Sequence, residues 1–145
     1  MPGYVIRALR KFGHPKPKRL QHAPHKCIEP VYGSTQLQQP TTESTTEPLE
    51  PKGITDVQSI NGTFIFYSQV NPCILVALNE IGSDQSKSTI YTMEKDNWPM
   101  NYLHTYPNAV IRFYASNMIL KISSDAAYLM QPKSRSRIAV HNHIG

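Results

Sequence analysis

Met118–Tyr128, with the sequence MILKISSDAAY, carries the pattern on which the fold prediction for this chain depends. Apolar and polar side chains alternate in it, so that Leu120 and Ile122 fall on one face of an extended segment and Lys121 falls on the other. This alternation predicts a strand that ends at Asp125, the last acidic residue of the chain. A carboxylate at a strand end, followed by a basic tail, is typical of a divalent-metal site near a phosphate backbone. The other interpretation is an aspartate that caps a turn.

Segments on either side of this stretch extend the predicted sheet. Residues 110–115 alternate with the same period of two, and Ser116-Asn117 is short enough for the turn of a hairpin. Residues 135–144 are expected to form a third strand, after a loop at residues 131–133. The sequence therefore predicts only the beginning of a sheet in this part of the chain.

Helical spacing dominates the sequence before residue 105. The expected helices cover residues 2–12, 56–67, 71–82 and 89–104. Asp56 and Asn71 are residue types that cap helices, and Gly82 is a residue type that ends them. A kink or break is expected at Pro99, because proline inside a helix removes a hydrogen bond and clashes with the preceding turn. The first helix is basic and amphipathic, with little apolar sequence nearby for its stripe to pack on.

Charge is distributed unevenly along the 145 residues, whose formal net charge is +5. Residues 1–28 contain no acidic side chain, and the residues after Asp125 are neutral or basic. Two basic ends suggest a polyanionic partner, most simply nucleic acid. The candidate contacts in the N-terminal part are Arg7, Arg10, Lys11, Lys16, Lys18 and Arg19. The alternative is a solvated basic arm without a specific partner.

Composition sets limits on the rest of the chain. Thr35–Pro51 is rich in Thr, Gln, Pro and Glu and has almost no large apolar residue, which predicts a disordered linker. Cys27 and Cys73 lie in unlike contexts, so no disulfide framework is predicted, and a reducing intracellular compartment, cytoplasm or nucleus, is expected. No stretch reaches the roughly 18 apolar residues of a membrane span, so no membrane partner is expected.

In their order along the chain, these segments resemble parts of copia-type retrotransposon polyproteins. The start of the ribonuclease H domain in that family is similar to SDAAYL followed by KSRSR, and its first hairpin is similar to YPNAVIRFYASNMILKI. The helical connection between reverse transcriptase and ribonuclease H is similar to VQSINGTFIFYSQVNPCILVALNEI. The region after the polymerase palm is similar to MPGYVIRALRKFGHPKPKRLQHAPH and EPVYG. The resemblance covers most of the chain and is weakest across Ser34–Pro51.

The resemblance implies a nuclease that holds divalent metals, Mg²⁺ in the family, and cleaves the RNA strand of an RNA–DNA hybrid with metal-activated water. Asp125 matches the first metal-binding carboxylate, and Arg135 and Arg137 match the basic block expected at the phosphate backbone. No other nuclease carboxylate can be carried over, so the site is expected to be incomplete and to hold no Mg²⁺ stably. Ile138–Val140 stand where the family usually has small residues. The chain has no adjacent Asp-Asp pair, so the polymerase palm motif is absent.

These observations predict an α+β chain, in which a helical segment is followed by an incomplete ribonuclease H-like sheet. The expected parts are a basic arm over residues 1–33, a disordered linker over 34–52, a helical connection segment over 53–106 and a truncated sheet over 107–145. The expected function is that of a fragment of a reverse transcriptase/ribonuclease H polyprotein, which handles RNA–DNA hybrid and is catalytically inactive alone. The alternative is a non-enzymatic basic module that binds nucleic acid or a protein. Neither interpretation implies a small-molecule substrate.

Overall fold

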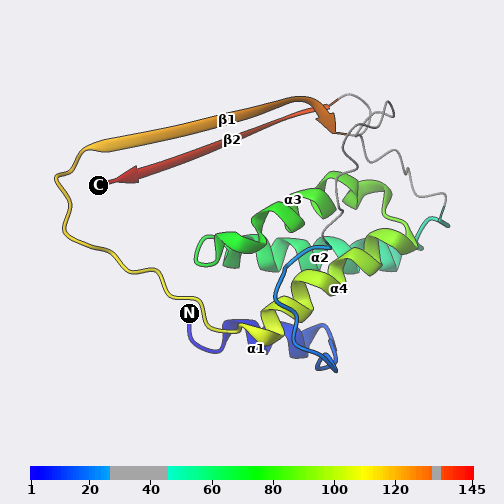
Figure 1. The fold of residues 1–145 in the computed structure, drawn as a ribbon. Coiled ribbons are helices and arrows are strands. Elements are labelled where there is room, and N and C mark those ends of the chain that lie inside the picture. The colour runs from blue at the N-terminus through cyan, green and yellow to red at the C-terminus, as the bar shows by residue number, and fades with distance from the viewer. Residues whose placement is uncertain (27–45, 132–134) are drawn as a thin grey trace. The chain divides into compact units, whose positions relative to one another are not determined.

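The computed structural model describes residues 1–26, 46–131 and 135–145 (Figure 1). The elements are α1 (Tyr4–Lys11), α2 (Pro51–Ser68), α3 (Leu75–Asp84), α4 (Ile90–Thr105), β1 (Leu120–Gln131) and β2 (Arg135–Ile144), with 3-10 turns at Pro72–Ile74 and Gln85–Lys87. Its described part divides into a helical unit, residues 1–26 and 46–111, and a hairpin unit, residues 112–131 and 135–145. The predicted α+β class is confirmed. None of the helices in these ranges is both long and apolar enough to cross a membrane.

The start of α2 differs from the prediction. The helix begins at Pro51, ahead of Asp56, which lies exposed inside it instead of capping it. Proline is favoured in a first turn, because its fixed φ suits the helix and its missing N–H would have no helical partner there. The buried apolar side chains of α2 follow the predicted spacing and are Val57, Ile60, Phe64 and Tyr67.

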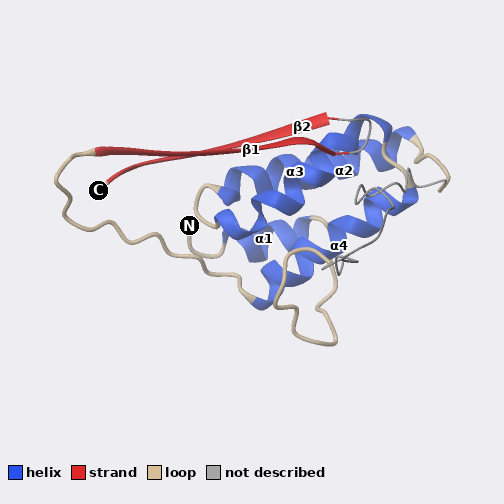
Figure 2. Cartoon of the chain, turned by 45° about the horizontal axis from the view of Figure 1, so that its top comes forward, coloured by secondary structure: helices blue, strands red, loops and turns tan. Residues whose placement is uncertain are grey.

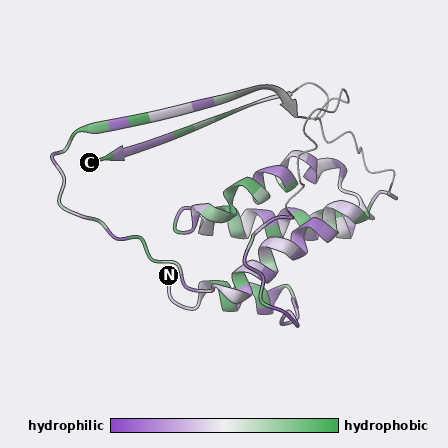
Figure 3. Ribbon diagram, in the orientation of Figure 1, coloured by the Kyte–Doolittle hydropathy of each residue, from purple (hydrophilic) through white to green (hydrophobic). Residues whose placement is uncertain are grey.

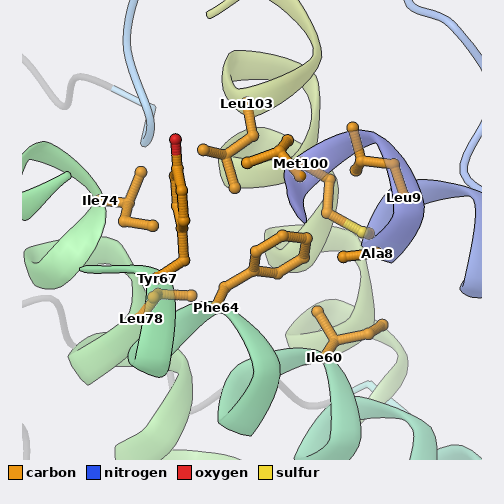
Figure 4. Packing of buried hydrophobic residues seen from close by; sticks show 10 residues of the cluster. Ala8, Leu9, Ile60, Phe64, Tyr67, Ile74, Leu78, Met100 and Leu103 are labelled. Atoms are coloured by element: carbon orange, nitrogen blue, oxygen red, sulfur yellow. The ribbon is translucent and has the colours of Figure 1, made fainter. Parts of the chain in front are cut away.

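The apolar stripe of α1 is covered by helices that come later in the chain. Val5 and Leu9 are buried in one core with Phe64 of α2 and Leu103 of α4. Figure 4 shows side chains of all four helices converging in this core. The apolar side chains that cover this helix therefore lie far away in sequence, in α2 and α4. The N-terminal helix is an integral part of the helical unit.

Gly82 has a packing role in α3. The helix runs to Asp84, past the end that the sequence predicts at Gly82. A Cβ atom at Gly82 would lie 2.9 Å from Nδ2 of Asn61, so glycine leaves room for this side chain between α2 and α3. Asn61 is buried, and its Nδ2 donates a hydrogen bond to Oε1 of Gln85 at 3.2 Å.

α4 begins with a reciprocal cap and continues through its proline. The Thr89 hydroxyl accepts a hydrogen bond from the N–H of Thr92, and the Thr92 hydroxyl accepts one from the N–H of Thr89. Of the kink or break expected at Pro99, the break does not occur, because the helix continues to Thr105. Pro99, Met100 and Leu103 are all buried. Their packing outweighs the cost of a proline inside the helix, which is about 3 kcal/mol.

The segment before α2 is held against the segment before α4. The backbone N–H of Leu49 donates a hydrogen bond to the carbonyl oxygen of Ser88 at 3.0 Å. The prediction of a disordered linker over Thr35–Pro51 is therefore wrong for residues 46–51, which this pairing and the first turn of α2 order. Residues 35–45 of that linker lie outside the described residues.

In the hairpin unit, β1 and β2 pair antiparallel, with Leu120 opposite Ile144 and Asp125 opposite Ala139. Figure 3 shows apolar and polar bands alternating along β1. The predicted strand over residues 135–144 is therefore present, as the direct partner of β1. The two strands form a two-stranded sheet, and its ribonuclease H-like character stays a prediction.

The predicted strand at residues 110–115 and its turn at Ser116-Asn117 are wrong. Residues 106–119 form neither helix nor strand and follow an irregular course (Figure 2). Phe113, which the prediction placed on an apolar face, is 92% exposed. Alternation identifies the two faces of a strand but not the strand that pairs with it, and β1 pairs with the segment after it instead.

Candidate nucleic-acid interface

The exposed side of α1 is positively charged. Arg7, Arg10 and Lys11 are exposed, on the side opposite to buried Val5 and Leu9. Their spacing of three and four residues makes them neighbours on the helix surface. Basic side chains in the last turn of a helix also interact favourably with its dipole. The sequence thus places its apolar residues in the core and its cations in solvent on the same short helix.

The loop after α1 is held against α4 by hydrogen bonds (Figure 1). Nε2 of His14 and Oδ1 of Asn101 are hydrogen-bonded at 2.8 Å. Further along, the backbone N–H of Gln21 donates a hydrogen bond to Oγ1 of Thr105 at 3.0 Å. Both anchors lie on one helix, so they fix the course of the loop between them.

Lys16, Lys18 and Arg19 are exposed in the part of the loop between these two anchors. Past the second anchor, Nδ1 of His22 is 2.7 Å from the hydroxyl oxygen of Tyr106, and the two rings are in contact with centroids 5.9 Å apart. The loop is therefore attached to the helical unit on both sides of its three cations.

We call Arg7, Arg10, Lys11, Lys16, Lys18 and Arg19 the N-terminal basic surface. Within the described ranges none of these six side chains forms an ion pair, whereas Nζ of Lys95 is paired with Oε1 of Glu80 at 2.8 Å. Nζ of Lys11 lies 5.2 Å from the centroid of the Phe12 ring, a cation–π contact that leaves its charge in place. Exposed cations without acidic partners are what a phosphate backbone can neutralise.

The two other predicted phosphate contacts lie on β2. Arg137 is opposite Ala127 in the backbone register, and Arg135 is opposite Gln131. Both arginine side chains lie outside what the structure describes. These residues belong to the hairpin unit, whereas the N-terminal basic surface belongs to the helical unit. The candidate interface therefore consists of side chains of the helical unit alone.

Asp125 lies in the middle of a strand, so its predicted place at a strand end is wrong. Pairing continues on both sides of it, and the side chain is exposed. Its Oδ1 accepts a hydrogen bond from the N–H of Ala126 at 2.8 Å. The register places Ser123 and His141 on the same face as Asp125. The ring of His141 stacks on that of His143, with centroids 5.0 Å apart.

The donors near Asp125 do not fit the magnesium site that the resemblance implies. Residues 112–145 contain one acidic side chain, Asp125 itself. Mg²⁺ prefers oxygen ligands in octahedral geometry, and a two-metal site needs several converging carboxylates, whereas hydroxyl and imidazole groups surround this position. In the part of the chain that the structure describes, no three potential metal ligands lie together. Asp125 is therefore given no catalytic role.

Asp96, a buried acidic residue of α4, was not among the predicted site residues. Asp96 is 0% exposed. Burial raises the pKa of its carboxyl group to about 7, because the charged form loses its solvation. Asp96 comes three residues after Met93 and four before Met100, which places it on one face of the helix with two apolar residues. An acid on an apolar stripe is the signal that could have identified it.

No model of a known protein family matches the chain, and no curated protein or solved structure matches it. The functional conclusion therefore depends on the residues themselves. The strongest arrangement is the N-terminal basic surface, because its cations are exposed and its loop is anchored at both ends.

Proposed function

We propose that this chain is a nucleic-acid-binding segment of a copia-type retrotransposon polyprotein, and that it contacts the phosphate backbone of RNA–DNA hybrid without cleaving it alone. The observation that carries the proposal is the N-terminal basic surface, with its exposed cations and without ion pairs among the described residues. The resemblance of the sequence segments supports the origin, and the arrangement of the cations supports the mode of binding.

Binding through this surface is expected to ignore nucleotide sequence, because contacts to phosphates position a protein without reading bases. It is also expected to depend steeply on salt, because each neutralised phosphate releases counterions. For six contacts, log Kd should rise with log salt with a slope of about 5. Affinity should therefore fall about 10³-fold between about 50 and 200 mM salt.

The test is fluorescence anisotropy of the full chain with a labelled RNA–DNA hybrid, repeated with a second, unrelated hybrid. Replacing Arg7, Arg10 and Lys11 together by Gln removes three charges from the exposed side of α1 and leaves its buried side unchanged. This variant should lower the salt slope by about 3, one unit for each lost phosphate contact. Deleting residues 1–26 is a poorer test, because it removes part of the core.

The matched control replaces Lys52, Lys87 and Arg112 by Gln, which removes three exposed cations outside the N-terminal basic surface. Net charge then changes equally in both variants, so the comparison isolates position. Equal loss of affinity in the two variants would contradict the proposal, as would binding that is independent of salt.

A further inference from the structure

A cavity of about 370 Å³ lies in the helical unit. Its wall is formed by residues 12–15 after α1, by Ile60 of α2 and by α4 from Ile90 to Met100. Its volume falls within the range of small-molecule pockets, about 300–1,000 Å³. The six residues of the N-terminal basic surface are not among those that line it. The cavity is therefore a feature separate from the candidate nucleic-acid interface.

Asp96 lines this cavity with both carboxyl oxygens buried and without a hydrogen-bond partner among the described residues. Such a group is costly, and buried polar groups in native proteins are generally paired. Two side chains of this region that could donate are engaged elsewhere: Lys95 is paired with Glu80, and Nε2 of His14 is hydrogen-bonded to Asn101. A partner for Asp96 therefore has to come from outside these side chains.

We infer that this cavity binds a small organic cation, a protonated primary amine on an apolar body, whose ammonium group pairs with Asp96. Ile60, Met93 and Met100 supply apolar wall for the body of the ligand, and Glu94 adds a second acidic side chain to the lining. An ammonium group has three N–H donors and can serve both oxygens of one carboxylate. A neutral ligand of the same shape fills the apolar space but leaves a carboxylate without a counter-charge.

The test compares benzylamine with benzyl alcohol, its neutral isostere, by ¹H–¹⁵N NMR titration of the full chain at pH 8. Benzylamine should shift the amide signals of the lining residues. It should bind about tenfold more tightly than benzyl alcohol or better, because a hydrogen bond between two charged groups is stronger than one between neutral groups. Equal affinity for the two probes would overturn the inference, and so would shifts confined to residues outside the cavity.

Two variants assign the preference to Asp96. Asp96→Asn keeps the size of the side chain and removes the charge, so it should abolish the preference for the amine. Asp56→Asn changes an exposed acid of α2 that does not line the cavity, so it should keep the preference. A preference that survives in Asp96→Asn would contradict the pairing.

A third variant covers the case in which circular dichroism shows that Asp96→Asn does not fold. Met93 lines the cavity and is also partly exposed, so Met93→Trp can fill the space while leaving Asp96 in place. It should weaken benzylamine binding about tenfold or more, as loss of most of the cavity requires. Unchanged affinity in a folded Met93→Trp protein would place the ligand elsewhere.

Discussion

At the scale of a single residue, Asp96 links the stability of the helical unit to pH. Burial raises the pKa of its carboxyl group to about 7 in the folded chain, whereas an unfolded chain has the ordinary value of about 3.9. Between these values the folded protein holds a proton that the unfolded chain releases. The free energy of unfolding should therefore decrease as pH rises through this window, with no penalty below about pH 4 and the full penalty above about pH 7.

Asp96→Asn should remove this component of the pH dependence. The shift of about three pKa units corresponds to a penalty on the order of 4 kcal/mol between pH 4 and pH 8. Urea unfolding of the two proteins across this range measures it, and the histidines cancel in the difference because both proteins contain them. The same comparison with Asp56→Asn, an exposed acid, serves as the control. If the free energy of unfolding depended on pH in the same way in the parent chain and in Asp96→Asn, this component of the pH dependence would not come from Asp96.

Asp125 represents the opposite case, an exposed carboxylate in the middle of a strand. Asp125→Asn should change the free energy of unfolding by less than about 0.5 kcal/mol, because surface substitutions away from packed groups have small effects. Neither protein should cleave a labelled RNA–DNA hybrid with magnesium or manganese, since one carboxylate cannot fix two divalent ions. Cleavage by the parent chain that disappears in Asp125→Asn would reveal a complete site.

At the scale of an element, α1 combines two roles on one short helix. Leu9 faces the core and Arg10 faces solvent, so neighbours in sequence should respond differently to the same substitution. Leu9→Ala should lower the free energy of unfolding by about 2–5 kcal/mol through the cavity it leaves. Arg10→Ala should change it by less than about 0.5 kcal/mol and should weaken hybrid binding instead. Thermal unfolding and anisotropy measure the two effects, and similar destabilisation by both substitutions would contradict this division.

The helices show which features of this fold could be predicted from sequence patterns. Apolar spacing identified all four of them, because the spacing of apolar residues is a property of the local sequence. Their boundaries depended on more: Pro51 starts α2 earlier, and Gly82 serves close packing instead of ending α3. Pro99 lies inside α4 and is buried there, which the sequence of the helix alone does not reveal.

For the strands and the candidate site too, the sequence predicted local features but not those that depend on contacts between distant residues. Alternation predicted a strand in the first part of β1, but residues 110–115 were expected to pair with it instead of β2. Periodicity contains no information about the partner of a strand. For the site, exposure of the basic residues followed from residue type alone. The burial of Asp96 could not be obtained in this way, because it is produced by packing among helices that meet only in the folded chain.

At the scale of the whole molecule, the candidate cations lie on two units, and one boundary between these units falls between residues 111 and 112. If the N-terminal basic surface dominates binding, a fragment of residues 1–111 should bind the hybrid within about threefold of the full chain. The salt slope should also be nearly the same, because it counts phosphate contacts. Anisotropy at two salt concentrations decides this. A loss of about two units of slope would instead assign phosphate contacts to Arg135 and Arg137.

The burial of α1 has a further consequence, because its attachment to the other helices is a set of non-covalent contacts. A synthetic peptide of residues 1–26 should therefore act as a ligand for a separately produced chain of residues 46–145. Mixing the two should give more helical circular dichroism than the sum of their separate spectra. A peptide with Leu9→Ala should complement far less well, and equal complementation by both peptides would argue against the buried interface. In the intact chain, α1 is covalently connected to the other helices. This connection raises the effective concentration of α1 at its binding site on them.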